Sequence, residues 1–402
     1  MATETSAAPL SGVRVLDLTN VLAGPFACHQ LAHFGAEVIK VEAVTGGDLA
    51  RNLGADPELS KRGMGISFLA QNAGKQSIAI NLKTDDGKAI FKRLVQTADV
   101  VVENFRPGVM KRLGLSAEVL RTEKPSLIYC AISGFGQDGP WAHRPAYDQI
   151  IQGASGVMSV TGTTDSGPLR AGYPLADTIG GLTAAMAIMG ALNAPERGCV
   201  IDVSMLEAVL ATMGWVVSNH LIGGVAPQAH GNENPTSAPS GAFQCADGLL
   251  NIAANKDEQW QSLATLLERD DLLQDPDFAT REMRKANRFR LKAEIETVLT
   301  KDTAHAWESK LNAAGIPSGA VLTVPEILSH PQVKDRGLLA SFEDVEGVGR
   351  TIEVMCVGAM VDGERPSVAD PPPTLGQHTT AILRALGYTQ SDVAAFQEAG
   401  AV

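Results

Sequence analysis

The sequence contains few charged and few aromatic residues. Charged side chains make up 19% of its 402 residues and aromatic ones 5%, whereas about 25% of the residues in an average soluble domain are charged. Acidic residues outnumber basic ones by 45 to 33, which gives a net charge of −12. A chain with this balance is poorly suited to bind nucleic acid or an anionic membrane. We therefore expect neither as a partner.

Cysteine is also scarce, and its spacing is typical of neither a disulfide framework nor a cysteine-based zinc site. The five cysteines lie far apart and form no CxxC pair, so we expect no disulfide and no metal. The first residues, MATETSAAPL, contain no basic segment and no long apolar segment, which argues against a signal peptide. The most apolar stretch, residues 181–192, is about 12 residues long, whereas a membrane span needs about 20. We expect a soluble cytoplasmic protein.

The signatures of several common enzyme classes are missing. The sequence has no P-loop, no HExxH zinc motif and no GxSxG motif. Residues 134–139, GFGQDG, match the GxGxxG pattern of dinucleotide-binding proteins, but Pro140 follows directly. A dinucleotide site would require this segment to open a helix. We interpret it instead as a loop at the carboxyl end of a strand, which is where ligands bind in open α/β sheets.

What the sequence does contain is a repeated alternation of short apolar runs and helical patterns. Residues 13–18 predict a strand, a helical pattern runs from Pro25 to Gly35, and residues 36–42 predict a second strand. This order forms a βαβ unit and implies a parallel sheet. Further strands are expected at residues 77–82, 99–105, 126–133 and 199–203. Because these runs are almost continuously apolar, both faces of the sheet should be covered.

The character of the later segments changes near residue 223. Residues 178–193 are rich in Ala, Gly and Met and predict a long helix, and residues 204–222 predict a second long helix. Residues 223–241 are rich in Gly, Pro, Asn and Ser, which indicates a loop or linker. A strand at residues 249–253 and more polar helical patterns at residues 258–314 follow. We infer that a separate, smaller module begins after residue 222.

The chain is accordingly divided into three segments. Residues 1–222 are the first part of a large domain, residues 223–325 form a small domain, and residues 326–402 are a C-terminal part. Within the last segment we expect a hairpin around residues 347–349 and a final helix near residues 379–386.

Asp177 is the carboxylate whose surroundings suggest chemistry. It lies in the sequence YPLADTIGG, directly before the Ala-rich helical pattern. Aspartate is a favoured N-cap residue, so a structural role is one interpretation. The position also suits a nucleophile, because a helix N-terminus stabilises a carboxylate and Gly180 and Gly181 would let a substrate approach the backbone. An aspartate can attack an acyl centre covalently, and position alone leaves both roles open.

Seven short segments between residues 9 and 136 resemble one family, and the resemblance extends over essentially the whole chain. They are residues 9–17 (PLSGVRVLD), 23–25 (AGP), 35–42 (GAEVIKVE), 47–48 (GD), 75–78 (KQSI), 102–108 (VENFRPG) and 133–136 (SGFG). In this combination the sequence resembles the class III CoA-transferases of the CaiB/BaiF type, whose fold is shared with α-methylacyl-CoA racemases. The resemblance implies a Rossmann-like parallel sheet in a large α/β domain built from both chain ends. It also implies a smaller middle domain and an interlocked homodimer.

The resemblance further implies that Asp177 is the nucleophile of a CoA transfer. Its carboxylate would attack an acyl-CoA thioester to give a mixed anhydride, and the CoA thiolate would then form a thioester with the aspartyl group. An acceptor carboxylate would run these steps in reverse. Coenzyme A thioester is then a substrate, and no tightly bound cofactor is expected.

Four residues match family positions at the nucleotide end of CoA. Lys83 and Arg112 correspond to basic residues that hold the phosphates. Ile80 corresponds to an apolar contact near the adenine, and Met205 to a methionine in the nucleotide region. These roles are implied by the resemblance alone.

Five residues match positions along the rest of CoA. Asn104 and Phe105 correspond to a pair at a strand end that lines the CoA channel, and Arg106 follows them. Tyr147, with Asp148 beside it, corresponds to a tyrosine near the thioester. The resemblance thus assigns all five to CoA binding.

The sequence departs from parts of the family at two positions and in one loop. Ala43 stands where some members carry an arginine for the CoA phosphates, and Leu22 stands where formyl-CoA transferases carry a glutamine. Residues 231–243 are short and lack the run of glycines found in those enzymes. They look more like the loop of members that use succinate, itaconate or citramalate. We therefore expect a small dicarboxylic acid such as succinate, itaconate or citramalate as acceptor, and not oxalate, with succinyl-CoA as the donor to consider first.

The contacts to the acid's second carboxylate are not determined by the sequence, and two other functions stay open. Candidates for those contacts are Arg51, Arg62 and His29. A racemase would use the histidine of a Gly-His-Asp motif, but this chain reads Ala-Tyr-Asp at residues 146–148, with the nearest histidine at His143. A non-catalytic CoA-binding protein is the second alternative, and the presence of Asp177 argues against it.

Overall fold

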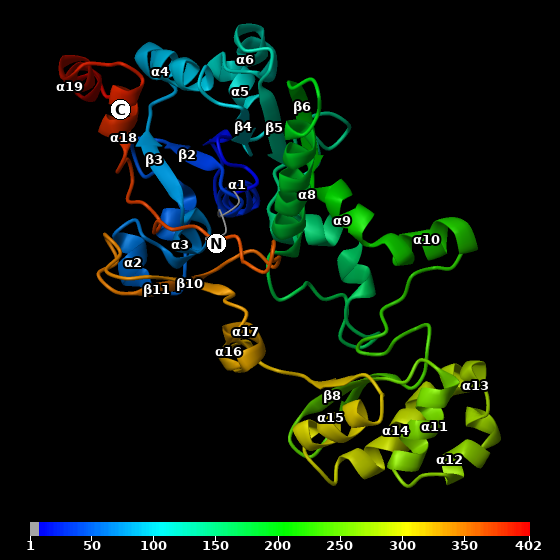
Figure 1. Cartoon of the computed structure of the whole chain (residues 1–402). Coiled ribbons are helices and arrows are strands. Elements are labelled where there is room, and N and C mark those ends of the chain that lie inside the picture. The colour runs from blue at the N-terminus through cyan, green and yellow to red at the C-terminus, as the bar shows by residue number, and fades with distance from the viewer. Residues whose placement is uncertain (1–7) are drawn as a thin grey trace. The chain divides into compact units, whose positions relative to one another are not determined.

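A six-stranded parallel sheet forms the centre of the larger of two compact units (Figure 1). The computed structural model describes residues 8–402, so most of the N-terminal segment examined for a signal peptide lies outside it. The strand order is β3–β2–β1–β4–β5–β6. The strands are β1 (Arg14–Asp17), β2 (Glu37–Glu42), β3 (Lys75–Ala79), β4 (Val100–Glu103), β5 (Ile128–Ser133) and β6 (Cys199–Ser204). The predicted α/β class with a Rossmann-like parallel sheet is confirmed.

The order of the strands reverses between β1 and β4, which lie side by side although β2 and β3 come between them in sequence. Crossover helices leave these two strands on opposite sides of the sheet, so a crevice opens at their carboxyl ends. Ligands of open α/β sheets bind in this crevice. The topology therefore fixes where the functional site should be sought.

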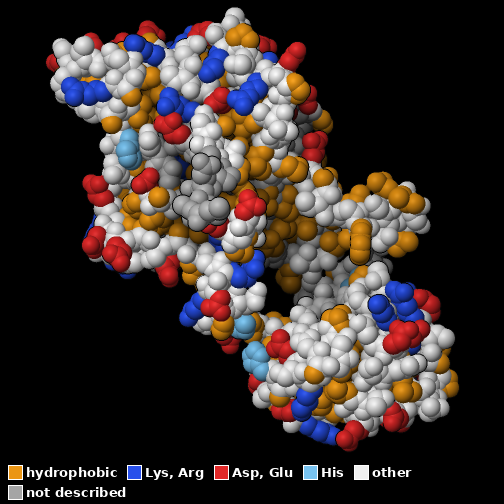
Figure 2. Space-filling model, viewed as in Figure 1, with side chains coloured by type: hydrophobic (Ala, Val, Ile, Leu, Met, Phe, Trp, Pro, Cys, Tyr) orange, Lys and Arg blue, Asp and Glu red, His pale blue; other side chains and the backbone are white. Residues whose placement is uncertain are grey.

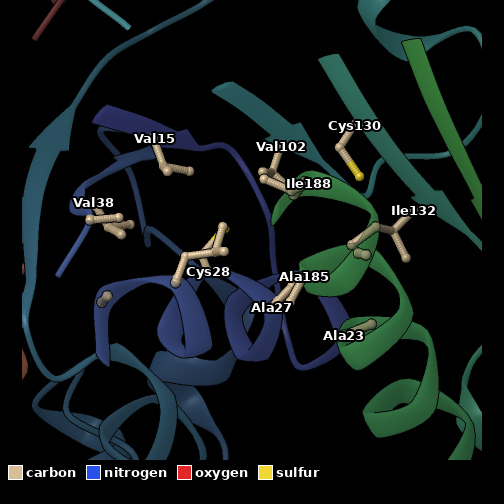
Figure 3. Packing of buried hydrophobic residues seen from close by; sticks show 14 of the residues in the cluster. Val15, Ala23, Ala27, Cys28, Val38, Val102, Cys130, Ile132, Ala185 and Ile188 are labelled. Atoms are coloured by element: carbon tan, nitrogen blue, oxygen red, sulfur yellow. The ribbon is translucent and has the colours of Figure 1, made fainter. Parts of the chain in front are cut away.

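Both faces of the sheet are covered, as the apolar strands predicted. Helices α1 (Ala23–His33) and α8 (Leu175–Leu192) pack on one face, where Val15 and Val102 point toward them (Figure 3). Neighbouring strand residues such as Leu16 point to the opposite face because successive side chains alternate along a strand. The helices of that second layer are α4 (Asp85–Val95), α5 (Val109–Leu113), α6 (Ala117–Glu123), α18 (Thr379–Ala385) and α19 (Gln390–Glu398).

Helices α1 and α8 approach each other closely through small residues. A Cβ atom added to Gly181 would lie 2.5 Å from the Ala23 carbonyl oxygen, and one added to Gly180 would lie 2.8 Å from Met205 Cγ. The space beside both glycines is thus filled by the protein. The expectation that they admit substrate to the backbone was wrong, because they serve helix packing instead.

The chain divides into two compact units that each combine segments distant in sequence. Among the described residues, the larger comprises residues 8–157, 170–224 and 332–402, and the smaller comprises residues 158–169 and 225–331. The domain boundaries at residues 222 and 325 inferred above stay a prediction. In the last segment, strands β10 (Leu339–Phe342) and β11 (Ile352–Met355) form the hairpin expected around residues 347–349. Helix α18 was also expected, whereas α19 was missed.

The smaller unit is built on a three-stranded antiparallel sheet in the order β7–β8–β9. Aromatic and aliphatic side chains such as Trp260, Phe278 and Leu291 form its core. Its strands are β7 (Ser240–Gln244), β8 (Leu249–Ala253) and β9 (Ser318–Ala320). Its helices are α11 (Asp257–Leu266), α12 (Asp271–Gln274), η3 (Pro276–Phe278), α13 (Arg281–Ala286), α14 (Arg288–Leu299), α15 (Ala304–Ala313) and α16 (Val324–Ser329).

The remaining elements are short. In the larger unit they are η1 (Leu49–Asn52), α2 (Pro57–Lys61), α3 (Ile66–Asn72), α7 (Asp148–Ala154), α9 (Met205–Thr212) and α10 (Gly214–Gly223). Two more, η2 (Val157–Val160) and α17 (Pro331–Lys334), lie where the chain passes from one unit to the other.

Helices α8, α9 and α10 differ from the sequence-based expectation. Helix α8 has 18 residues and is long and apolar enough to cross a membrane by length and composition, so the argument from a twelve-residue stretch was wrong. Its buried side, which includes Ala185 and Ile188, belongs to the core shared with α1 (Figure 3). The single long helix predicted for residues 204–222 is broken into α9 and α10, whose axes differ by 76°.

Helix α10 has no buried residue. Its large apolar side chains Trp215, Leu221 and Ile222 are 84%, 76% and 88% exposed. Figure 2 shows hydrophobic side chains gathered over this helix. Exposed apolar surface of this kind marks an interaction site more often than a free surface.

Candidate active site

Asp177 lies in the first turn of α8, at the carboxyl end of the parallel sheet. The helix begins at Leu175 and its N-cap is Pro174. The N-cap interpretation of Asp177 was therefore wrong, because the helix starts earlier than the sequence pattern indicated. A carboxylate in the first turn still benefits from the unpaired N–H groups of the helix start.

The start of α8 is capped by Asp148 instead. Its Oδ1 accepts hydrogen bonds from the backbone N–H groups of Ala176 at 2.8 Å and Asp177 at 3.4 Å. Its Oδ2 accepts a hydrogen bond from Gln152 Nε2 at 2.7 Å. Asp148 is buried, so its oxygens are held by the protein. The role in CoA binding implied by the resemblance stays a prediction.

A cavity of about 360 Å³ lies in front of Asp177. Its walls come from the ends of strands β1, β4 and β5 and from the starts of α1, α8 and α9. It is lined by Asn20, Val21, Leu22, Ala23, Leu49, Asn104, Phe105, Arg106, Ile132, Ser133, Gly134, Pro145, Ala146, Tyr147, Asp177 and Met205. The structure thus brings Asn104, Phe105, Arg106, Tyr147 and Met205 together with Asp177, as residues of one site.

The pKa of Asp177 is raised to about 7, first by burial and second by the negative charge of Asp148. Burial has this effect because it removes water that would otherwise stabilise the carboxylate. A carboxyl group perturbed in this way in a cavity at strand ends is typical of a functional site.

A second cavity, of about 460 Å³, shares Asn20 and Phe105 with the first. It is lined by the end of β2 and the segment after β3, and it includes Ile80 and Lys83. Ile80 is buried whereas Lys83 is exposed, so the cavity offers an apolar contact and a cation. Met205, expected in the nucleotide region, lies at the Asp177 end instead.

Arg112 is placed differently from the other predicted CoA contacts. It is exposed on α5 and lines neither of these two cavities. Its neighbour Leu113 does line the second cavity, so Arg112 lies on the helix that forms that rim. A direct role for it stays a prediction.

Two of the three candidates for a second carboxylate are engaged elsewhere in the structure. Arg51 is 1% exposed, and its Nε and Nη2 both donate to the Glu42 carboxylate at 2.7 Å. His29 is 2% exposed within α1, with its ring centroid 4.3 Å from that of His33. Arg62 lines neither of the two cavities. The expectation for Arg51 and His29 was wrong, because both belong to the interior.

The turn between β1 and α1 contributes Asn20, Val21 and Leu22 to the cavity wall. The sequence analysis singled out Leu22 through the family resemblance but missed Asn20 and Val21. The Asn20 N–H donates to Asn104 Oδ1 and Asn104 Nδ2 donates to the Asn20 carbonyl oxygen, both at 2.8 Å. Asn104 therefore positions this turn as well as lining the cavity. For Asn20 and Val21, the signal in the sequence was their place shortly after the first strand.

Glu103 is the last residue of β4 and directly precedes the Asn104–Phe105 pair. It is 5% exposed, its Oε2 accepts a hydrogen bond from the Phe105 N–H at 2.7 Å, and Tyr129 donates to its Oε1 at 3.3 Å. Burial raises its pKa to about 7. It fixes the backbone of a residue that lines both cavities.

The comparisons with known proteins agree with this geometry. The family model of CoA-transferase family III matches residues 10–379. The chain belongs to this family. It is 38% identical to the succinate–glutarate CoA-transferase of Agrobacterium fabrum, over 94% of this chain and 96% of that protein. It is 40% identical to the acetyl-CoA:oxalate CoA-transferase of Acetobacter aceti, over 88% of this chain and 92% of that protein.

A solved structure shares the fold. The chain matches the crystal structure of a CaiB/BaiF family protein from Brucella suis with a TM-score of 0.83 and 34% identity, covering 95% of this chain and 100% of that one. This protein is thus a family III CoA-transferase with the CaiB/BaiF fold. Among residues 8–402, no histidine lines the cavity of Asp177, so the two-base arrangement of a racemase is not found there.

Proposed function

We propose that this CoA-transferase moves CoA from an acyl-CoA donor to a small dicarboxylic acid through covalent intermediates on Asp177. The observation that carries the proposal is the position of Asp177. It is the carboxylate that lines the cavity at the strand ends, next to the residues matched to the CoA channel. Burial that raises its pKa also limits the water that could hydrolyse an acyl intermediate.

The reaction conserves one thioester bond. An Asp177 carboxylate oxygen attacks the thioester carbonyl carbon, the C–S bond breaks, and an acyl-aspartyl anhydride and CoA thiolate result. The thiolate attacks the Asp177 carbonyl carbon and releases the donor acid as a carboxylate. The acceptor carboxylate then attacks the aspartyl thioester, and the released thiolate attacks the acceptor's carbonyl carbon. The products are the acceptor's CoA thioester and free Asp177.

Two adjacent cavities suit an extended ligand such as CoA. The one with Ile80 and Lys83 would take the nucleotide end, with Lys83 near the phosphates. Asn104 and Phe105, at the boundary, would contact the pantetheine arm, and Tyr147 would lie near the thioester. Arg106 lies in the Asp177 cavity, where its charge would attract an anionic acid.

The acids to test follow from the relatives. One relative is named for succinate and glutarate and another for oxalate. Residues 231–243, which the sequence analysis treated as a loop, end in the first residues of β7. The short connection before this strand favours dicarboxylates longer than oxalate. Succinyl-CoA is the first donor to test, with glutarate, citramalate, itaconate and oxalate as acceptors.

The assembly proposed is a homodimer in which α10 is covered. Its exposed apolar residues, together with Leu182 and Met186 on α8, need a covering surface in water. A second copy of the chain supplies one, in line with the interlocked dimer that the family resemblance implies. The cytoplasmic location stays a prediction.

The decisive experiment replaces the nucleophile. Asp177→Ala should abolish CoA transfer while thermal unfolding stays cooperative, and Glu118→Ala, at an exposed carboxylate in the first turn of α6, should leave transfer intact. In the wild type, hydroxylamine should modify Asp177 only when acyl-CoA is present, as peptide mass spectrometry would show. Full turnover by Asp177→Ala would refute the proposal.

A further inference from the structure

The turn that forms one wall of the Asp177 cavity has an unusual backbone. Val21, in the middle of this turn between β1 and α1, has a φ of +68°. A β-branched residue rarely adopts this left-handed conformation, because its Cβ crowds the following carbonyl oxygen. Among residues 8–402, the other three non-glycine residues with positive φ are Asp or Glu. Some interaction must therefore hold Val21 in place.

Asp48 provides that interaction. Its Oδ1 accepts the Val21 N–H at 2.9 Å, and the same oxygen accepts the Ala50 N–H at 2.9 Å at the start of η1. The side chain is fully buried, so water cannot take its place. Asn104 holds the neighbouring Asn20 by two hydrogen bonds. The turn is thus held from two separate segments of the chain.

Asp48 is in turn fixed by a buried cation. Lys40 Nζ lies 2.9 Å from Asp48 Oδ2, with both side chains 0% exposed, and it also donates to the Thr19 carbonyl oxygen at 2.8 Å. Although burial alone would lower the pKa of Lys40, Asp17 and Asp48 outweigh it and the net shift is upward. Lys40 therefore stays charged, and it binds both Asp48 and Thr19, the residue directly before Asn20.

The residue before Asp48 shows how closely this arrangement is packed. Gly47 has a φ of +60°, and a Cβ atom there would lie 2.7 Å from Glu42 Oε2. The same Glu42 oxygen accepts the Asp48 N–H at 3.0 Å. A side chain at residue 47 would displace the Glu42 carboxylate, which orients Asp48. The arrangement therefore requires glycine directly before Asp48.

We propose that Asp48, fixed by Lys40, is a positioning residue for the transfer reaction. It holds Val21 in the left-handed conformation and so keeps Asn20 and Leu22 in the wall facing Asp177. Asp48 lines neither the Asp177 cavity nor the Lys83 cavity, so it acts through the backbone of the turn. The inference rests on the proposed reaction at Asp177.

The alternative is that Asp48 only stabilises the fold. Buried ion pairs are weak contributors to stability, since desolvation opposes their attraction, yet removing one partner is costly. A loss of stability in a variant would thus fit both views. The two differ in what should happen when the strain at Val21 is removed, because glycine adopts a φ of +68° freely.

The test is a double-mutant cycle of Asp48→Ala and Val21→Gly, assayed with succinyl-CoA and glutarate at a temperature where each variant is folded. We expect Asp48→Ala to lower kcat about thirtyfold relative to the wild type. The double variant Asp48→Ala, Val21→Gly should have a kcat at least about fivefold higher than that of Asp48→Ala alone. Asp48→Asn, which keeps an acceptor for Val21, should lose less than Asp48→Ala. The control is Asp257→Ala, which breaks the ion pair with buried Arg284 in the smaller unit. It should lower Tm without any coupling to Val21→Gly.

Two results would overturn the inference. One is Asp48→Ala with a kcat within about threefold of wild type per folded protein, and the other is a double variant no faster than Asp48→Ala. Either would leave Asp48 as a stabilising residue only. Each kcat is compared with that of an active wild type, so these results test the role of Asp48 and not the proposed reaction. The proposed reaction is refuted by a different result, which is turnover by Asp177→Ala.

Discussion

Asp148 and Asp177 are coupled through the first turn of α8. Asp148 Oδ1 accepts the N–H groups of Ala176 and Asp177, while its charge adds to the burial that raises the pKa of Asp177 to about 7. One side chain thus anchors the helix turn that carries Asp177 and makes the ionised form of Asp177 less favourable. A carboxylate of higher pKa is a more basic and more reactive nucleophile once it is ionised.

The first prediction concerns pH. Because only the carboxylate of Asp177 can attack, kcat/KM should rise with pH up to about 7 and be level above it. Asp148→Asn removes the charge but keeps an oxygen that can accept from α8, so it should move this limb to lower pH. Initial rates from pH 5 to 9 test both. If the rising part of the pH profile does not move in Asp148→Asn, the titrating group is not Asp177. Glu103, whose pKa is also raised to about 7, would then be tested next with Glu103→Gln.

The second prediction is that the nucleophile destabilises the fold. A carboxyl whose pKa is raised in the folded state, here from 3.8 to about 7, binds more protons when folded than when unfolded. Stability is therefore lost as pH rises through this interval. At pH 8, Asp177→Asn should raise Tm and increase the free energy of unfolding by an amount on the order of a few kcal/mol. Both increases should shrink toward pH 4. Glu118→Asn, at an exposed position, should show no such trend, and an equal gain at both pH values would contradict the explanation.

The sequence predicted the sheet and drew attention to Asp177, because both leave local signals, whereas the nucleophilic role of Asp177 stays a prediction. Apolar runs such as residues 126–133 lie within two residues of the observed β5, and the YPLAD segment pointed to Asp177. The family resemblance added Asn104, Phe105, Arg106 and Tyr147, all of which line the cavity.

The interior charges could not be predicted in this way. Lys40 and Lys75 look like ordinary cations of two strands, yet both are fully buried. Their partner Asp17 comes from a third strand, where the two lysines outweigh burial and lower its pKa to about 2. Such pairs depend on strand register across the sheet, which no local pattern contains. The positive φ of Val21 was equally hidden, since it has neither glycine nor asparagine as a signal.

The third prediction concerns another buried ion pair, between Arg51 and Glu42. Arg51→Ala leaves the Glu42 carboxylate buried without its guanidinium partner, so it should lower the free energy of unfolding by about 3–5 kcal/mol. The control is Arg197→Ala, which breaks an ion pair with Asp99 at the surface and should cost at most about 1 kcal/mol. Urea unfolding of both variants provides the measurement. Similar losses in the two would show that burial of the pair does not govern its contribution.

The fourth prediction concerns Lys83, which lines the second cavity and is exposed. If it contacts the CoA phosphates, Lys83→Ala should raise KM for succinyl-CoA about three- to tenfold and leave kcat almost unchanged. The effect should weaken as salt is raised, because mobile ions screen an exposed charge. Lys88→Ala, one turn into α4 and outside both cavities, is the matched control. An equal rise in KM for Lys88→Ala would point to general attraction rather than a specific contact.

The last prediction concerns the surface of α10. Trp215 and Ile222 are 84% and 88% exposed in the isolated chain, and contact with a second copy would remove this apolar area from water. Replacing both by Glu should therefore weaken the dimer, because burial of two charges opposes association. Sedimentation velocity over a range of concentrations should show a dimer for the wild type and smaller or aggregated species for the variant. Asn219→Glu adds a charge to the same helix at an exposed polar position and should keep the dimer. A wild type that sediments as a monomer, or a Glu pair that leaves the dimer intact, would show that α10 is not the covered surface.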